Sequence, residues 1–575
     1  MAAIILNSRN LAAHGPELID SEVELPKTVS DALIEALVAM GAQFAFGMIG
    51  GSIVPFYEGL LRAPLQVVNF RHESGATYAA LEASLATDAP VIAFATTGPG
   101  LSNALTGAIA ARWEGAKMLL VSGYTGSERR GRFSLQESND HTLAAGIYSP
   151  GGLFDHAVAL EHEAELPTVL RALARGFASR RGFVAHVALP LGVQSRTAPQ
   201  AALTLAATDV APNDATMAEV CNRLREPFAV WVGHGARHAA AQIRKLIDRT
   251  NAPVLSTPRG KGIVSEEDPR YLGVSGAVGS HVDLAARMQA ARVKRVLVLG
   301  SRLGEFSSAY QTELIPPGGL IHVDLDPRVP GSAFPQIETL AVQAEIGQFV
   351  ERLLAGLETR PGPIRVEPRP QPALLDPRPS ARVRPQYLMQ CLQARVVEES
   401  DALVMAESGN AFAWTSNCLR FSEPHRYRQA GLFCPMGHIS AGAIGAALAG
   451  GRRAIAVVGD GAFVMQNEIS TAVQLDASVT WIVLNDARYG MVHQGLRARG
   501  HVDPGMDVPP VDFVALARAF GAKGERVESE QQLLTALERA VRARGPCVLD
   551  VMIDPDEPAP FGARIRSIDN QAKAS

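Results

Sequence analysis

The sequence predicts an α/β protein built from three doubly wound parallel-sheet domains. Short apolar segments alternate with amphipathic segments along most of the chain, a pattern typical of parallel sheets covered by helices on both faces. At 575 residues the chain is too long for a single hydrophobic core. A Pro-rich segment at 361–385 cannot form a regular element, so we expect an interdomain linker there.

The first expected domain covers residues 28–195. It begins with apolar residues at helical spacing over 30–41, followed by a β-like segment at 44–48. Further strands are expected at 67–70, 91–97, 117–123 and 182–193, with helices at 74–88 and 101–115.

The second and third expected domains cover 205–360 and 386–560. Apolar segments at 228–233, 253–258, 293–300 and 319–327 predict the strands of the second domain. Those at 402–407, 454–459, 479–485 and 547–554 predict the strands of the third, whose sheet resembles that of the first.

Composition excludes several classes of function. A net charge of −4 and a pI near 6.4 provide no basic surface for nucleic acid. No apolar run reaches the roughly 20 residues of a membrane span, and the first residues lack the cationic region of a secretory signal. The five cysteines are scattered without CxxC spacing, which favours reduced thiols. We therefore expect a cytoplasmic protein with no membrane partner.

The sharpest chemical pattern is AVVGDGAFVMQNEISTAVQLDASVTWIVLNDARYGM at 456–491. A buried strand ends at Gly459-Asp460-Gly461, and the next strand ends at Asn485-Asp486. Carboxylates at the ends of neighbouring parallel strands meet at the edge where such sheets bind ligands. Two carboxylates beside a Gly-rich turn suit Mg²⁺ bound to phosphate oxygens. By itself the pattern is also compatible with a tight turn and two solvated acids.

The full segment resembles the cofactor signature of the thiamine-diphosphate enzymes of the acetolactate synthase, pyruvate oxidase and pyruvate decarboxylase superfamily. The resemblance extends over 28–560 in the family's order of pyrimidine-binding, central and pyrophosphate-binding domains. It implies that Asp460, Asp486 and the carbonyl of Arg488 bind Mg²⁺. Most members have Asn where this chain has Asp486, although catabolic acetolactate synthases resemble the Asp form.

The resemblance implies further cofactor contacts. Glu73 in NFRHES resembles the glutamate that binds N1′ of the aminopyrimidine, although an N-terminal helix Glu is the structural alternative. Met436 resembles the residue that bends the cofactor, and a plain core Met is its alternative. The carbonyl of Cys434 would receive the 4′-amino group. The complete expected set of cofactor-binding residues is Glu73, Asn410, Cys434, Met436, Gly459, Asp460, Gly461, Ala462, Asp486, Tyr489, Gly490 and Met491.

Two residues in the first domain resemble substrate-side groups of the family. TTGPG at 96–100 resembles the family's loop beside the active site, and Gln136 lies where acetolactate synthases and pyruvate oxidases carry a substrate-side Gln. His141 in DHTL resembles part of the tandem-His segment of simple decarboxylases and could move protons. A surface-loop histidine is the equal alternative for His141. With Glu73 and Met436, these residues complete the expected catalytic set.

The resemblance favours a carboligase that acts on a 2-oxo acid and a carbonyl acceptor, similar to acetolactate synthase. A non-oxidative 2-oxo acid decarboxylase is the alternative, and a flavin-dependent oxidase is a weaker one. The segments VWVGHGARHA (230–239) and VLGSRLGEF (298–306) fail the GxGxxG spacing of a nicotinamide dehydrogenase. FAD in the central domain is not favoured. The family's cofactor bridges two subunits, so the resemblance implies a homodimer or homotetramer.

Overall fold

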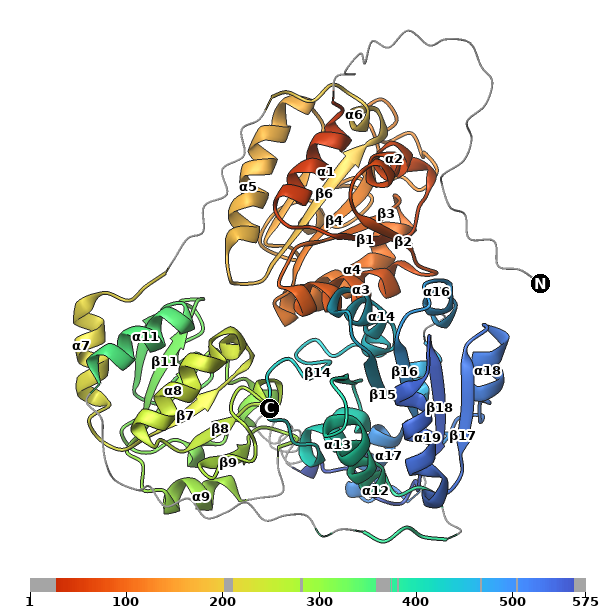
Figure 1. Ribbon diagram of the computed structural model, residues 1–575. Coiled ribbons are helices and arrows are strands. Elements are labelled where there is room, and N and C mark those ends of the chain that lie inside the picture. The colour runs from red at the N-terminus through yellow and green to blue at the C-terminus, as the bar shows by residue number, and fades with distance from the viewer. Residues whose placement is uncertain are drawn as a thin grey trace, which may run out of the picture.

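The computed structural model describes residues 27–200, 210–279, 283–357, 373, 375–379, 382–465, 468–502 and 505–562. These residues form three six-stranded sheets, each flanked by helices (Figure 1). Every pairing between the strands of these sheets is parallel. The predicted fold class is thus confirmed. Most of the expected linker 361–385 lies outside the described residues.

The first sheet has the strand order β2-β1-β3-β4-β6-β5. Its strands are β1 (Phe44–Gly47), β2 (Gln66–Asn69), β3 (Val91–Ala95), β4 (Lys117–Tyr124), β5 (His156–Ala159) and β6 (Phe183–Pro190). The helices of this domain are α1 (Val29–Ala39), α2 (Val54–Arg62), α3 (Glu73–Thr87), α4 (Pro99–Glu114), α5 (Leu166–Ala178) and α6 (Leu191–Gln194). Strands β3 and β4 are buried along their whole length, which explains their continuous apolar sequences.

The central sheet has the order β12-β11-β10-β7-β8-β9. Its strands are β7 (Phe228–Val232), β8 (Val254–Ser256), β9 (Tyr271–Val274), β10 (Arg295–Leu299), β11 (Leu320–Asp324) and β12 (Thr339–Gln343). Its helices are α7 (Asp214–Arg223), α8 (Ala240–Thr250), α9 (Leu284–Ala290), α10 (Glu305–Ser308) and α11 (Ile346–Gly356).

The third sheet has the order β14-β13-β15-β16-β18-β17, which repeats the order of the first sheet strand for strand. Its strands are β13 (Leu403–Ala406), β14 (Tyr427–Gln429), β15 (Ala454–Gly459), β16 (Val479–Asn485), β17 (Lys523–Val527) and β18 (Cys547–Met552). Its helices are α12 (Pro385–Leu392), α13 (Asn410–Cys418), α14 (His438–Gly450), α15 (Asp460–Phe463), α16 (Ile469–Gln474), α17 (Gly490–Ala498), α18 (Phe513–Ala519) and α19 (Glu530–Arg542).

Helices α3 and α14 pack against each other and join the first domain to the third (Figure 1). Both consist largely of Ala, Gly and Ser, so their backbones approach closely. A Cβ atom placed on Gly445 of α14 would lie 2.0 Å from the carbonyl oxygen of Ala79. Only glycine therefore fits at this crossing, and one continuous apolar core runs through both domains.

A buried ionic cluster reinforces the same junction. Glu82 of α3 pairs with Arg428 of β14 at 3.0 Å, and His438 Nε2 at the start of α14 lies 3.0 Å from Glu82 Oε1. Burial alone would raise the pKa of Glu82, but the charges and hydrogen bonds of Arg428 and His438 outweigh it and lower that pKa to about 2. The two domains are consequently held together by charge as well as by apolar contact.

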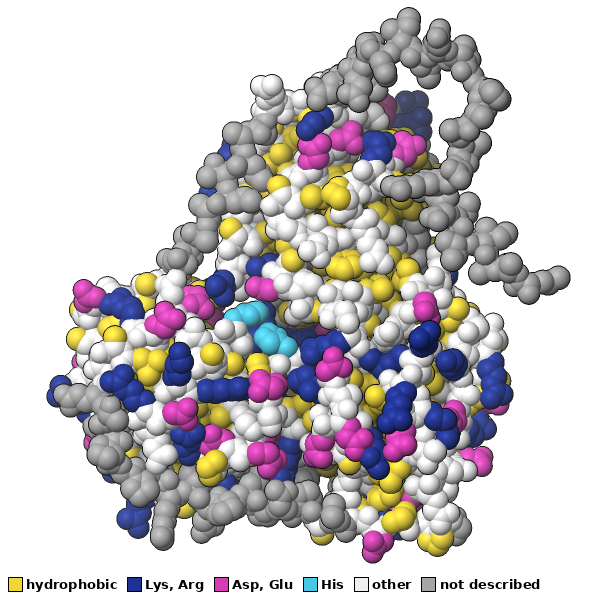
Figure 2. Space-filling view, in the orientation of Figure 1, with side chains coloured by type: hydrophobic (Ala, Val, Ile, Leu, Met, Phe, Trp, Pro, Cys, Tyr) yellow, Lys and Arg dark blue, Asp and Glu magenta, His cyan; other side chains and the backbone are white. Residues whose placement is uncertain are grey.

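Histidine side chains also lie in a hollow where the three lobes meet (Figure 2). The rings of His238 and His425, from the central and third domains, are 5.5 Å apart. Asp88 of the first domain lies 3.6 Å from Arg237.

Within the described residues, no helix has both the length and the apolar character needed to cross a membrane.

Candidate active site

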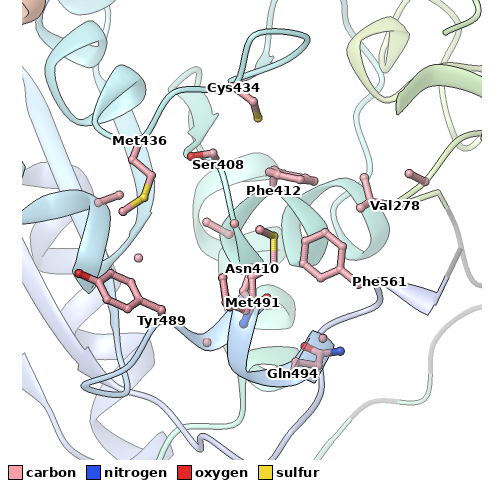
Figure 3. Close-up of a pocket in the computed structure, with 18 of the residues that line it drawn as sticks. Val278, Ser408, Asn410, Phe412, Cys434, Met436, Tyr489, Met491, Gln494 and Phe561 are labelled. Atoms are coloured by element: carbon pink, nitrogen blue, oxygen red, sulfur yellow. The ribbon is translucent and has the colours of Figure 1, made fainter. Parts of the chain in front are cut away.

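A pocket of about 910 Å³ opens at the carboxyl edge of the third sheet. It lies where β13, β15 and β16 end, because the loops after these parallel strands converge at one edge. Most of the residues predicted to bind the cofactor or the metal line it: Asn410, Cys434, Met436, Gly459, Asp460, Gly461, Ala462, Asp486, Arg488, Tyr489, Gly490 and Met491. Figure 3 shows several of these side chains around the pocket.

Asp460 and Asp486 bring two carboxyl groups to this edge. The Asp460 carboxylate accepts hydrogen bonds from the backbone N–H groups of Gly461 (2.6 Å) and Ala487 (2.8 Å). Burial raises the pKa of Asp460 above its ordinary value. Burial, and then the negative charge of Asp460, raises the pKa of Asp486 from 3.8 to about 7. A divalent cation between the two groups would relieve this repulsion.

The other groups in the pocket fit a cation bound to a diphosphate. Cβ atoms placed on Gly409 and Gly459 would meet no described atom within 4 Å, so the backbone there is open to a ligand. The Oδ1 atom of Asn410 is buried and has no hydrogen-bond partner among the described residues. The carbonyl of Arg488 accepts from Gly490 N–H at 2.9 Å and keeps a second lone pair for a metal.

No group of three or more His, Cys, Asp or Glu side chains within the described ranges is arranged to hold a metal. A cation bound by Asp460 and Asp486 would therefore take its remaining ligands from backbone carbonyls, water and phosphate. Mg²⁺ is commonly bound in this way, by one or two carboxylates with phosphate oxygens and water.

Met436 and Tyr489 face each other across Gly461. A Cβ on Gly461 would lie 3.0 Å from the Tyr489 ring and 3.7 Å from Met436 Cε. Met436 is 38% exposed in the single chain, so it is a pocket residue rather than the plain core Met of the structural alternative. Cys434 has a left-handed backbone with φ of 53°. Such a conformation is uncommon for a residue other than Gly, Asn or Asp.

The segment that carries Met436 is fixed by a residue that the sequence did not reveal as important. Glu407 is fully buried at the end of β13. Its carboxylate accepts from the backbone N–H groups of Ile439 (2.9 Å) and Ser440 (3.1 Å) in the first turn of α14. Burial raises the pKa of Glu407. Because α14 begins two residues after Met436, Glu407 holds the start of the helix that follows the Met436 segment.

Glu73 lies elsewhere, at the carboxyl edge of the first sheet. It is the first residue of α3 and is 6% exposed. Its Oε2 accepts from Asn103 Nδ2 at 3.1 Å. A Cβ on Gly100 would lie 3.2 Å from Glu73 Oε1, so the TTGPG loop packs against the carboxylate. Asn103 is a second residue that sequence reasoning missed.

Gln136 joins the same edge of the first sheet. A Cβ on Gly98 would lie 3.0 Å from Gln136 Cβ, and Gly98 N–H donates to Ser138 Oγ at 2.5 Å. Gln136 itself is exposed and has φ of 55°. His141 lies farther along the same loop with 84% of its side chain exposed. None of Glu73, Gln136 and His141 lines the pocket of the third domain.

Comparison with known proteins identifies the family. Models of the thiamine pyrophosphate enzymes match residues 27–143 (N-terminal TPP binding domain), 215–353 (central domain) and 407–551 (C-terminal TPP binding domain). The chain belongs to the thiamine pyrophosphate enzyme family. The two matched TPP-binding domains contain the two edges described above, one with Glu73 and one with Asp460. The resemblance inferred from the sequence is confirmed.

Among curated proteins, this thiamine pyrophosphate enzyme is similar to several acetolactate synthases. A Mycobacterium tuberculosis protein provisionally assigned as the acetolactate synthase large subunit IlvB2 is 31% identical, over 92% of this chain and 98% of its own. The acetolactate synthase isozyme 1 large subunit of Escherichia coli is 25% identical, over 92% and 94%. The X-ray structure of a Mycobacterium smegmatis protein provisionally described as thiamin diphosphate-dependent has a TM-score of 0.79. It is 21% identical and covers 92% of this chain and 99% of that one, which shows the shared fold.

Proposed function

We propose that this enzyme is a thiamine-diphosphate- and Mg²⁺-dependent carboligase. It decarboxylates a 2-oxo acid and joins the remaining acyl unit to a second carbonyl compound. The observation that carries the proposal is the 910 Å³ pocket, which gathers the expected cofactor residues and leaves space beyond them for substrates. The similarity to acetolactate synthases supports the same reaction class.

In this proposal the third domain holds the charged part of the cofactor. Asp460, Asp486 and the carbonyl of Arg488 would hold Mg²⁺, and Asn410 Oδ1, which has no partner among the described residues, would be available to the bound cofactor and metal. The open backbone at Gly459, directly before α15, would receive the diphosphate. When bound, thiamine diphosphate supplies an acidic C2–H group and an electron sink for the loss of CO₂.

Glu73 is the proposed proton relay. A carboxyl shielded from solvent and bound by Asn103 can exchange a proton with N1′ of the aminopyrimidine. Met436 would support the bent cofactor, and the carbonyl of Cys434 would accept from the 4′-amino group. Gln136 would orient the substrate from the same edge as Glu73.

The active sites are proposed to lie between subunits of a homodimer or homotetramer. Glu73 and Gln136 do not line the pocket of their own chain. A second copy of the chain would bring its first-domain edge to that pocket and complete the site. Two apolar side chains on the Gln136 loop, Phe133 and Leu135, are 99% and 94% exposed in the single chain, which supports their burial by a partner.

A product assay tests the reaction class. Purified protein with thiamine diphosphate and Mg²⁺ is incubated with pyruvate alone and with a panel of aldehydes and 2-oxo acids, and CO₂ and carbon products are followed by mass spectrometry. A new acyloin or 2-hydroxy-2-alkyl-3-oxo acid supports carboligation. CO₂ with an aldehyde as the only product would instead favour the decarboxylase, in which His141 would move protons. Product formation that requires a bound flavin would favour the oxidase.

The role of Glu73 has its own test. The substitution Glu73→Gln should abolish exchange of the C2 proton of bound thiamine diphosphate while the protein stays folded. Retained exchange in the variant would contradict the assignment.

A further inference from the structure

The pocket has a second half that is formed mainly by residues not expected to bind the cofactor. In Figure 3, Met436 and Tyr489 lie on one side, while Val278, Phe412 and Phe561 lie on the other. Those three side chains come from the central domain, α13 and the segment after β18 respectively. We call this second half the apolar annex. Its walls are Val278, Phe306, Phe412, Phe561, Gly304 and Gly495.

The aromatic side chains of the annex pack against one another. The rings of Phe306 and Phe412 are 5.2 Å apart at 71°, and those of Phe412 and Phe561 are 5.5 Å apart at 82°. Both are edge-to-face arrangements of the kind that aromatic pairs prefer. Gln494 of α17 donates to the carbonyl of Ala559 at 2.6 Å and accepts from Ala559 N–H at 3.1 Å. This pair ties the segment before Phe561 to α17.

Two glycines leave open space in this wall. Cβ atoms placed on Gly495 and Gly304 would meet no described atom within 4 Å. Neither glycine has a positive φ, so backbone strain does not require glycine at either position. Gly495 lies inside α17, where glycine destabilises a helix relative to alanine. Glycine at position 495 therefore leaves open volume in the annex.

Helix α17 connects Gly495 to the half of the pocket that is expected to bind the cofactor. It follows Met491 by four residues on α17, so the two positions lie on one face of the helix. Both line the pocket. The face of α17 that carries Met491 therefore continues to Gly495 and the aromatic wall.

We propose that the apolar annex selects a 2-oxo acid with a bulky branched or aromatic substituent, and that Gly495 is the residue that admits it. This inference rests on the proposed function for the reaction itself. The annex walls named above are apolar, and such walls favour an apolar substituent that fills the space between them. Each methylene that fits such a pocket changes selectivity by roughly 10–200-fold.

Variants of Gly495 test the proposal. Wild type is expected to release CO₂ from 4-methyl-2-oxopentanoate or phenylpyruvate with kcat/KM at least about 10-fold above that for pyruvate. Gly495→Leu should fill the annex and lower the ratio of kcat/KM for the bulky acid to kcat/KM for pyruvate by about 10-fold or more. Gly495→Ala adds only one methyl group and should lower this ratio less than Gly495→Leu does.

Gly192→Leu is the matched control outside the pocket. Gly192 lies in α6, and a Cβ there would likewise meet no described atom. This variant should keep the wild-type substrate ratio. Preference for pyruvate in wild type, or an unchanged ratio in a folded Gly495→Leu, would overturn the proposal.

A binding measurement separates this proposal from the proposed function. Calorimetric titration of protein loaded with thiamine diphosphate and Mg²⁺ compares 4-methyl-2-oxopentanoate with pyruvate in wild type and Gly495→Leu. If no 2-oxo acid yields CO₂, the proposed reaction fails. Tighter binding of the branched acid, lost in Gly495→Leu, would still support the annex, whereas equal binding would refute it.

Discussion

The substitution Asp486→Asn should stabilise the protein in the absence of metal. Burial and the charge of Asp460 raise the pKa of Asp486 from 3.8 to about 7, so the folded state disfavours the charged carboxylate. At about 1.36 kcal/mol per pKa unit, this shift corresponds to about 4 kcal/mol, and partial solvent exposure reduces the expected gain to about 2–4 kcal/mol. Asparagine keeps the shape of the side chain and removes the charge.

The gain should depend on pH in a defined direction. Above pH 7 Asp486 is charged in both the folded and the unfolded protein, so the full penalty is present in wild type. Below pH 3.8 it is protonated in both states and the penalty disappears. The stabilisation by Asp486→Asn should therefore decrease as the pH falls from 7 toward 3.8. Adding Mg²⁺ and thiamine diphosphate should reduce the difference in stability between wild type and Asp486→Asn, because the cation relieves the carboxylate repulsion only in wild type.

Urea denaturation of metal-free protein at about pH 8 and about pH 5 measures both effects. Asp512→Asn is the matched control, since Asp512 caps α18 through the N–H groups of Val514 and Ala515, far from this pair in the sequence. Asparagine caps a helix nearly as well as aspartate, and the exposed ion pair of Asp512 with Arg526 contributes little, so the control should change stability little. An Asp486→Asn variant no more stable than wild type at pH 8 without metal would refute the idea of a repelling carboxylate pair.

Two further stability predictions follow from buried carboxylates. Glu82→Gln leaves Arg428 buried without its charged partner and should destabilise the protein by about 3–5 kcal/mol in urea denaturation, against no change for the exposed Glu528→Gln. A urea midpoint of Glu82→Gln equal to that of wild type would contradict a stabilising role for the cluster of Glu82, Arg428 and His438. Glu407→Leu leaves the buried N–H groups of Ile439 and Ser440 in α14 unpaired, which should destabilise the protein by about 1–3 kcal/mol for each group. The same variant should weaken thiamine diphosphate binding measured by titration. Glu407→Gln keeps an acceptor, so its losses of stability and of binding should be smaller.

The interior of each sheet could be predicted from the sequence, while most sheet edges could not. The central strands, such as β4 and β16, are buried on both faces and therefore read as continuous apolar runs. The strands that sequence reasoning missed are β5, β9, β12, β14 and β17, and all of them lie at sheet edges. An edge strand pairs on one side only, so short or charged sequences such as YRQ in β14 and KGERV in β17 are sufficient.

The candidate active site likewise contains residues that could be predicted from the sequence and residues that could not. Asp460 and Asp486 could be predicted to lie close together because each directly follows a recognisable strand, and adjacent parallel strands end at one edge. The supports of the site could not be predicted in this way. Glu407 binds α14 residues 32 and 33 positions away, and Asn103 binds Glu73 across 30 positions. Contacts of this range depend on the packing of whole helices, which a single sequence does not display.

The separation of Glu73 from the pocket leads to a final prediction about assembly. Glu73 lines the edge of the first sheet, whereas Asp460 lines the pocket of the third, and the two do not share a cavity within the described chain. If each active site combines Glu73 of one copy with Asp460 of another, Glu73→Gln and Asp460→Ala should each be inactive alone. A mixed dimer would contain one site with both wild-type residues and one site with neither. Purified mixed dimers, selected with two affinity tags, should then regain about half of the wild-type activity.

The matched control pairs the double variant with Glu73→Gln, which restores no complete site and should stay inactive. Inactive mixed dimers of the two single variants would show instead that Glu73 and Asp460 must act from the same chain, which would overturn the proposed shared site.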